Sequence, residues 1–254
     1  MRKLLLPFQV LYVVYAFLLF FLLMLPVFVW ALFATLFGRI RGGNLVYYSC
    51  IAWATIWFPL IFIRHRNIYL QKPRKGQSYI FVANHISYLD AAIIPTIFRR
   101  QLRPLGKAEM AKIPVFGTIY KNAIVTVDRS NPANRAKSVQ ALKSILRKGI
   151  SVLVFPEGTF NETGKPLKDF YEGAFRIAIE TGTPVKPVLI LDMYDRMHTQ
   201  SVFSLNPGRS RAVFLPEVPT EGLTIKDAPA LKETVYRLME KELIAYKASW
   251  IKEP

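Results

Sequence analysis

Two polar side chains five positions apart, His85 and Asp90, directly follow the short apolar run 79–83. In a continuous helix, residues at this spacing point about 140° apart, so the pair can meet only where the chain turns between them. Ser87 offers that turn, because a serine three residues before an acid resembles a capping box at a helix start. Asp90 would then hold one imidazole nitrogen as N–H and leave the other able to accept a proton.

Such a pair suits a general base that deprotonates a hydroxyl group attacking a thioester carbonyl. The sequence contains no serine nucleophile motif of the G-x-S-x-G type, so the attacking hydroxyl would belong to the substrate. The alternative is structural: Asp90 caps a helix and His85 is an incidental loop residue. The pair alone is compatible with both interpretations.

A tight turn is predicted where the apolar run 151–155 ends in Pro156, Glu157, Gly158 and Thr159. Ligands of open α/β sheets bind at the carboxyl ends of the strands. The backbone amides of Gly158 and Thr159 would there face an anion or a substrate hydroxyl. An ordinary β-turn is the alternative.

Two basic residues, Lys107 and Arg129, lie near predicted strand ends. Either would clamp a phosphate, Arg129 with bidentate geometry. Because the chain has 34 Lys and Arg, surface charge is the alternative for both residues, as is a pairing of Arg129 with Asp128.

Apolar runs alternate with helical patterns after residue 66. This alternation predicts an α/β fold with a mostly parallel central sheet flanked by helices. The expected strands are 79–83, 123–127, 151–155, 184–191 and 211–215, and the expected helices are 87–98, 134–147, 171–180 and 228–248.

Residues 1–66 form a predicted helical membrane-attachment segment, and residues 67–254 a predicted catalytic domain. The run 4–38 has Gln9 as its single strongly polar side chain and would be roughly 50 Å long as one helix, against a hydrocarbon core of about 30 Å. Gly42 and Gly43 predict a turn before a second apolar stretch. A broken helix in one leaflet keeps all flanking basic residues on the cytoplasmic face and is favoured over a two-span hairpin. These basic residues are Arg2, Lys3, Arg39, Arg41, Arg64 and Arg66.

The formal net charge is 34 − 17 = +17. A surface of this charge suits anionic membrane lipids, an acidic carrier protein, phosphorylated substrates or nucleic acid. The apolar N-terminal region favours lipid, and no nucleic-acid partner is expected because no aromatic and basic recognition motif is present. The single cysteine, Cys50, excludes an intrachain disulfide and a thiolate metal site.

Taken together and in this order, these blocks resemble the lysophosphatidic acid acyltransferase family of membrane glycerolipid acyltransferases, over roughly residues 67–215. The resemblance implies that His85 is the general base and Asp90 its orienting partner. Arg129 and the block Glu157, Gly158 and Thr159 would bind the acceptor, with Lys107 near the active site. The apolar block 184–188 is similar to a family motif near the acyl donor.

The resemblance further implies transfer of a fatty acyl group from acyl-CoA or acyl-acyl carrier protein to lysophosphatidic acid, giving phosphatidic acid. The acyl group would pass by direct attack, with no metal and no cofactor besides the donor. The expected location is the cytoplasmic face of a membrane, by analogy the bacterial inner membrane.

The sequence departs from the family at Phe160, where an arginine is usual after the threonine. A charge-assisted hydrogen bond of this kind contributes about 1.5–3 kcal/mol. Either Lys107, Arg129 and Lys186 hold the phosphate without it, or the acceptor is a lyso-aminolipid such as a lyso-ornithine or lyso-glycine lipid. A further alternative is a non-catalytic membrane scaffold with a basic face.

Overall fold

The computed structural model describes residues 2–127 and 132–252. Its centre is a seven-stranded sheet in the order β1-β7-β6-β2-β5-β3-β4, in which all neighbours are parallel except β6 and β7. The predicted α/β fold with a mostly parallel sheet is confirmed. The strands are β1 (Ile63–Tyr69), β2 (Ile80–Ala83), β3 (Leu102–Lys107), β4 (Val125–Val127), β5 (Ser151–Val154), β6 (Val185–Ile190) and β7 (Gly208–Phe214).

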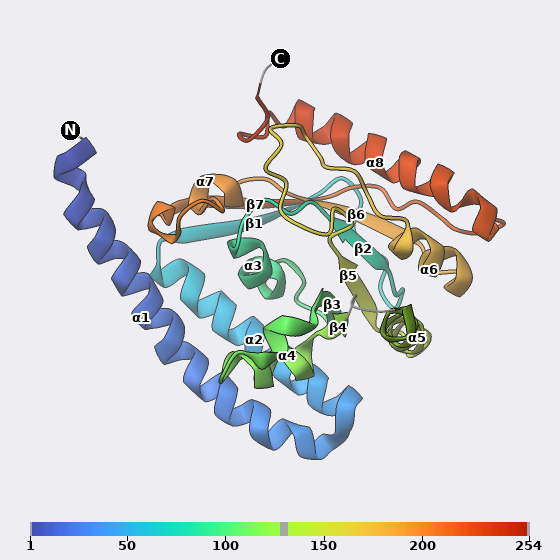
Figure 1. Ribbon diagram of the computed structural model, residues 1–254, viewed down its shortest axis with the longest axis horizontal. Coiled ribbons are helices and arrows are strands. Elements are labelled where there is room, and N and C mark those ends of the chain that lie inside the picture. The colour runs from blue at the N-terminus through green and yellow to red at the C-terminus, as the bar shows by residue number, and fades with distance from the viewer. Residues whose placement is uncertain (1, 128–131, 253–254) are drawn as a thin grey trace.

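Helices cover both faces of the sheet (Figure 1). One face packs against α1 (Arg2–Ala34), α2 (Gly38–Leu60), α3 (Leu89–Ile97) and α4 (Phe116–Ala123). The other packs against α5 (Pro132–Arg147), α6 (Gly173–Thr181) and α8 (Ala228–Ala245). The short helix α7 (Met193–Arg196) follows β6. Because β2, β5 and β6 are buried along their whole length, they read as continuous apolar runs, as expected for strands covered on both faces.

The strands β1 and β3 were missed by the sequence reasoning. β1 carries Arg64, His65 and Arg66 at the edge of the sheet, where alternate side chains are exposed. β3 contains Pro104 and Gly106, residue types that normally argue against a strand interior. The predicted boundary after residue 66 therefore falls inside β1.

The N-terminal segment is a helical hairpin. Its turn is a short 3-10 helix, η1 (Thr35–Phe37), followed by Gly38 with a positive φ of 75°. The turn predicted at Gly42 and Gly43 is wrong, because both residues lie inside α2. A Cβ at Gly42 would lie 2.1 Å from the carbonyl oxygen of Ala34, so this glycine lets the start of α2 approach the end of α1.

The hairpin is apolar on its outer surface. Within the helical region Pro7–Leu60, the most apolar 18-residue window has a mean hydropathy of 2.7, and 22% of that window is buried. By length and composition it is able to cross a membrane. Side chains such as Leu18 and Phe21 are more than 60% exposed, which suits a lipid-facing surface.

Candidate active site

His85 and Asp90 meet in the turn between β2 and α3. The Nδ1 atom of His85 lies 2.9 Å from Oδ2 of Asp90. The same carboxylate oxygen accepts hydrogen bonds from the backbone amides of Ile86 at 2.7 Å and Ser87 at 2.8 Å. The predicted contact between His85 and Asp90 is confirmed. The helix begins at Leu89, two residues later than predicted, and Ser87 Oγ accepts its backbone N–H at 3.1 Å.

The environment of Asp90 fixes the orientation of the imidazole. Asp90 is fully buried, and an oxygen that accepts two backbone N–H bonds leaves the Nδ1 position of His85 to act as the third donor. Nε2 is then the imidazole atom able to accept a proton. The His85 side chain is 18% exposed, so a substrate can reach it.

Glu157 lies behind His85. Its Oε1 accepts the backbone N–H of His85 at 2.8 Å, and its Oε2 accepts that of Lys168 at 2.9 Å. Burial raises the pKa of Glu157 from 4.5 to about 7, while the two backbone hydrogen bonds oppose that rise. Glu157 was predicted to bind substrate. In the structure both oxygens instead accept backbone N–H groups, and Oε1 fixes the backbone of His85.

Two phenyl rings pack against the imidazole. The ring centroid of Phe155 lies 4.1 Å from that of His85 with the planes 15° apart, and the centroid of Phe160 lies 4.2 Å away at 50°. Tyr88, half exposed, contacts Phe160 edge-on. The sequence identifies Phe160 only as a position where the family usually has arginine. It does not predict that Phe155 and Phe160 pack against the imidazole of His85.

A buried amide, also missed, ties the end of β2 to the end of β6. Asn84 Nδ2 donates to the carbonyl oxygen of Ile190 at 3.0 Å, and the backbone N–H of Ile190 donates to Asn84 Oδ1 at 2.8 Å. The sequence offered one indication of this role, because Asn84 directly precedes His85. The two hydrogen bonds of Asn84 fix the end of β2, the strand that His85 follows.

The remaining predicted residues lie at different places. Gly158 has a φ of 74°, and its N–H closes a β-turn onto the carbonyl of Phe155 at 3.1 Å. Thr159 is exposed, and its Oγ1 accepts a hydrogen bond from Lys168 Nζ at 2.7 Å. Lys107 ends β3 and is exposed, and Arg129 lies outside the described residues.

Lys186 is not near His85. Lys186 has no solvent-exposed surface, and its Nζ donates a hydrogen bond to Oε1 of Gln71 at 2.6 Å. It stands at the start of β6, at the end of the sheet away from the carboxyl ends of the strands. The interpretation of Lys186 as a phosphate ligand is therefore wrong, because the pleat and strand direction aim it elsewhere. No group of three or more His, Cys, Asp or Glu suited to a metal ion occurs in the described part of the chain.

Comparison with known proteins places this site in a family. The model of a family described as "Acyltransferase" matches residues 64–191, just over half of the chain, and includes both His85–Asp90 and the turn at Glu157. The chain belongs to the acyltransferase family.

Relatives of this acyltransferase carry consistent names. A mouse protein named 1-acyl-sn-glycerol-3-phosphate acyltransferase alpha is 31% identical over 64% of this chain, and a Limnanthes douglasii protein named 1-acyl-sn-glycerol-3-phosphate acyltransferase is 30% identical over 74%. The matches span 58% and 65% of those relatives' lengths.

The fold of the acyltransferase is also found in a solved structure. The crystal structure of the 1-acyl-sn-glycerophosphate acyltransferase PlsC from Thermotoga maritima superimposes with a TM-score of 0.78, at 23% identity, over 99% of this chain and 100% of that one. The N-terminal hairpin and the sheet therefore both belong to the shared fold.

Proposed function

We propose that this acyltransferase moves a fatty acyl group from acyl-CoA or acyl-acyl carrier protein to the hydroxyl of lysophosphatidic acid, giving phosphatidic acid. The observation that carries the proposal is the 2.9 Å contact between His85 and Asp90, just after the carboxyl end of the central strand β2. The names of the relatives, which specify a 1-acylglycerol-3-phosphate acceptor, support the choice of substrate.

In the proposed mechanism, the acceptor hydroxyl lies beside Nε2 of His85. Nε2 takes the hydroxyl proton while the oxygen attacks the thioester carbonyl carbon, and Asp90 stabilises the imidazolium that forms. The tetrahedral centre then collapses. A C–O ester bond has formed, the C–S bond breaks, and the imidazolium returns its proton to the departing thiolate. Protein side chains form no covalent intermediate.

Phosphate recognition in this proposal falls to Lys107, Arg129 and Thr159. Lys107 ends β3, which lies two strands from β2 in the sheet, and Arg129 follows β4 in sequence. Phe160 favours a second candidate function, O-acylation of a lyso-aminolipid, because an aromatic ring stands where a guanidinium would meet a phosphate. In both functions the chemistry at His85 is the same.

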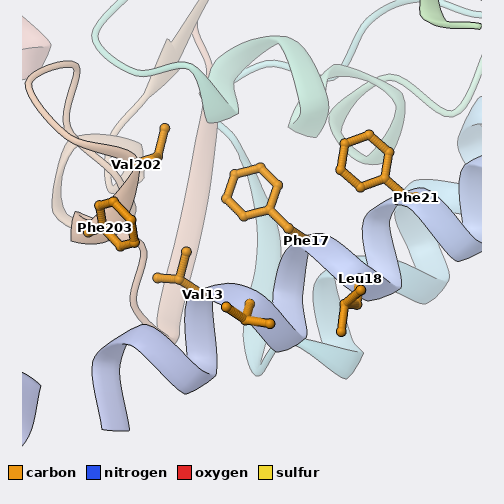
Figure 2. Close-up of a pocket in the computed structure, with 7 residues that line it drawn as sticks. Val13, Phe17, Leu18, Phe21, Val202 and Phe203 are labelled. Carbon is orange, nitrogen blue, oxygen red and sulfur yellow. The ribbon is translucent and has the colours of Figure 1, made fainter. Parts of the chain in front are cut away.

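We propose that residues 1–66 attach the enzyme to one leaflet and that the catalytic domain lies on the cytoplasmic face. An apolar groove between α1 and η3 (Val202–Ser204) supports this arrangement. Figure 2 shows Phe17 and Phe21 on the same side of α1 as Val202 and Phe203, with Leu18 on the opposite side of the helix. The apolar surface thus continues from the hairpin onto a loop of the catalytic domain, which a helix crossing the bilayer alone would not require.

The test is a product assay with purified enzyme in mixed vesicles. Each lyso-acceptor is offered with acyl-CoA and with acyl-acyl carrier protein, and products are identified by mass. We expect His85→Ala to keep vesicle binding and lose transfer, and His65→Ala, which removes an imidazole from edge strand β1, to keep both. An active His85→Ala variant contradicts the assignment of the base. Absence of transfer by the wild type with every pair would favour a scaffold.

A further inference from the structure

Four arginines form a cluster on the edge strand β1 and its neighbour β7. The parallel register pairs Arg64 with Arg209 and Arg66 with Arg211. Paired residues of neighbouring strands point to the same face of a sheet. That face is the one covered by α8, because Ile68 and Val213, two residues further along each strand, pack in the core beneath it.

The arginine cluster is only partly neutralised. Asp192 accepts from Nε and Nη2 of Arg211 at 2.9 and 2.8 Å and lies 3.5 Å from Nε of Arg209. Arg64 and Arg66 are exposed and make no ion pair with any residue in the described ranges. Asp195 also interacts electrostatically with Arg211. The side chain of Arg196 lies beside Gly208 and adds a further positive charge. Like charges directly opposite one another destabilise a sheet, so this arrangement suits a bound anion.

The position of the cluster relative to His85 follows from the strand register. Ala83 pairs with Val188 and Ala212 pairs with Ile190, so His85 lies level with Ala212. Arg211 and Arg209 lie just beyond that level, at the edge where β2 ends. The lateral separation from β2 is about 10 Å for β7 and about 14 Å for β1, from two or three strand spacings.

We propose that the arginine cluster binds the phosphate of the phosphopantetheine arm on the acyl donor. This rests on the proposed function, because that function supplies the thioester. The arm joins the phosphate to the sulfur through about as many bonds as four residues of extended chain, which span roughly 13–14 Å. The arm is therefore long enough to span the lateral distance between a phosphate at the cluster and His85. Guanidinium groups suit a phosphate because each can donate two parallel hydrogen bonds to two phosphate oxygens.

The face of the sheet selects the donor over a membrane headgroup. α1 and α2, with their exposed apolar side chains, pack on the other face of the sheet (Figure 1). The arginine side chains thus lie on the sheet face opposite the apolar hairpin, although Arg64 follows the end of α2 by four residues. A water-soluble donor can approach the cluster while the acceptor enters from the bilayer.

The experiment compares donors that carry the same acyl chain: acyl-CoA, acyl-acyl carrier protein, acyl-phosphopantetheine and acyl-pantetheine, the last without phosphate. The variant is Arg64→Ala with Arg209→Ala, which leaves the Arg211–Asp192 pair intact. Arg237→Ala is the matched control, since it removes an exposed guanidinium from α8. Melting temperature and vesicle binding establish that each variant is folded.

We expect the double variant to lose roughly 10- to 100-fold in kcat/KM with all three phosphorylated donors, as for the loss of charge-assisted hydrogen bonds. Its activity with acyl-pantetheine and its KM for the acceptor should match those of the wild type. An equal loss with acyl-pantetheine, a raised acceptor KM, or a loss confined to acyl-CoA overturns the proposal. A wild type inactive with every donor would instead reject the proposed function.

Discussion

Replacing Asp90 with asparagine tests the general base most directly. The substitution keeps the size of the side chain and removes its charge. In the wild type, Oδ2 accepts from His85 Nδ1 and from the amides of Ile86 and Ser87. Asparagine has one acceptor oxygen and one donor nitrogen in place of two acceptors, so its two possible orientations have different consequences.

The energies of these two orientations decide the outcome. If the nitrogen faced the two backbone amides, each buried N–H would lose its acceptor at a cost of about 1–3 kcal/mol. The oxygen is therefore expected to keep the Oδ2 position, where it accepts from the two amides and from His85 Nδ1. The nitrogen then takes the Oδ1 position, which has no hydrogen-bond partner among the described residues. The tautomer is kept, but the neutral amide no longer stabilises the imidazolium that forms when Nε2 takes the proton, so the base is weakened. Loss of general-base catalysis typically lowers the rate by about 10²–10⁴.

The assay measures initial rates in mixed vesicles at saturating acceptor and donor. We expect kcat of Asp90→Asn to fall by about 10²–10⁴, with both KM values nearly unchanged. Asp169→Asn, at an exposed position, is the matched control. A folded Asp90→Asn enzyme with activity within about tenfold of the wild type would refute the role of the Asp90 charge in stabilising the imidazolium.

Three further changes have defined outcomes. Phe160→Arg should lower the KM for lysophosphatidic acid but not for a lyso-aminolipid, measured by product mass; equal changes would exclude a phosphate contact at this position. Because burial raises the pKa of Glu157 from 4.5 to about 7, the stability from its protonated form is present below pH 4.5 and is lost as the pH rises through 7, by about 3 kcal/mol in total. The melting temperature of Glu157→Gln minus that of the wild type should therefore rise across this range, and a flat difference would contradict the shift. Gly42→Ala should destabilise the protein by about 1–3 kcal/mol, because its Cβ meets Ala34; Gly173→Ala, which meets nothing within 4 Å, is the control in the same thermal melt.

The catalytic pair was predictable because its geometry is local. Eight consecutive residues, from Ala83 to Asp90, contain the strand end, the turn and the acid, and a capping pattern at Ser87 is enough to bring His85 and Asp90 together. The sheet was predictable for a related reason. Its central strands are buried on both faces and read as continuous apolar runs.

The supports of the site were not predictable, because they depend on which strands become neighbours. Glu157 reaches the backbone of His85 only because β5 pairs with β2. Asn84 reaches Ile190 only because β6 lies on the other side. Neither pairing can be read from a single stretch of sequence. The turn predicted at Gly42 and Gly43 was wrong because a single stretch of sequence does not show which helices pack together. Close packing against another helix can require glycine as strongly as a turn does.

In the proposed function, the sheet order gives the two substrates separate sides of His85. β2 has β6, β7 and β1 on one side and β5, β3 and β4 on the other. The arginine cluster lies on the first side, whereas Lys107 at the end of β3 lies on the second. Phe160 contacts the imidazole itself, where an arginine would oppose the positive charge that the base acquires during transfer. With an apolar ring there, an acceptor phosphate is neutralised only further along the edge, toward β3. In the proposed function, donor and acceptor phosphates therefore approach His85 from opposite sides, and Lys107→Ala should raise the acceptor KM while leaving the donor KM unchanged.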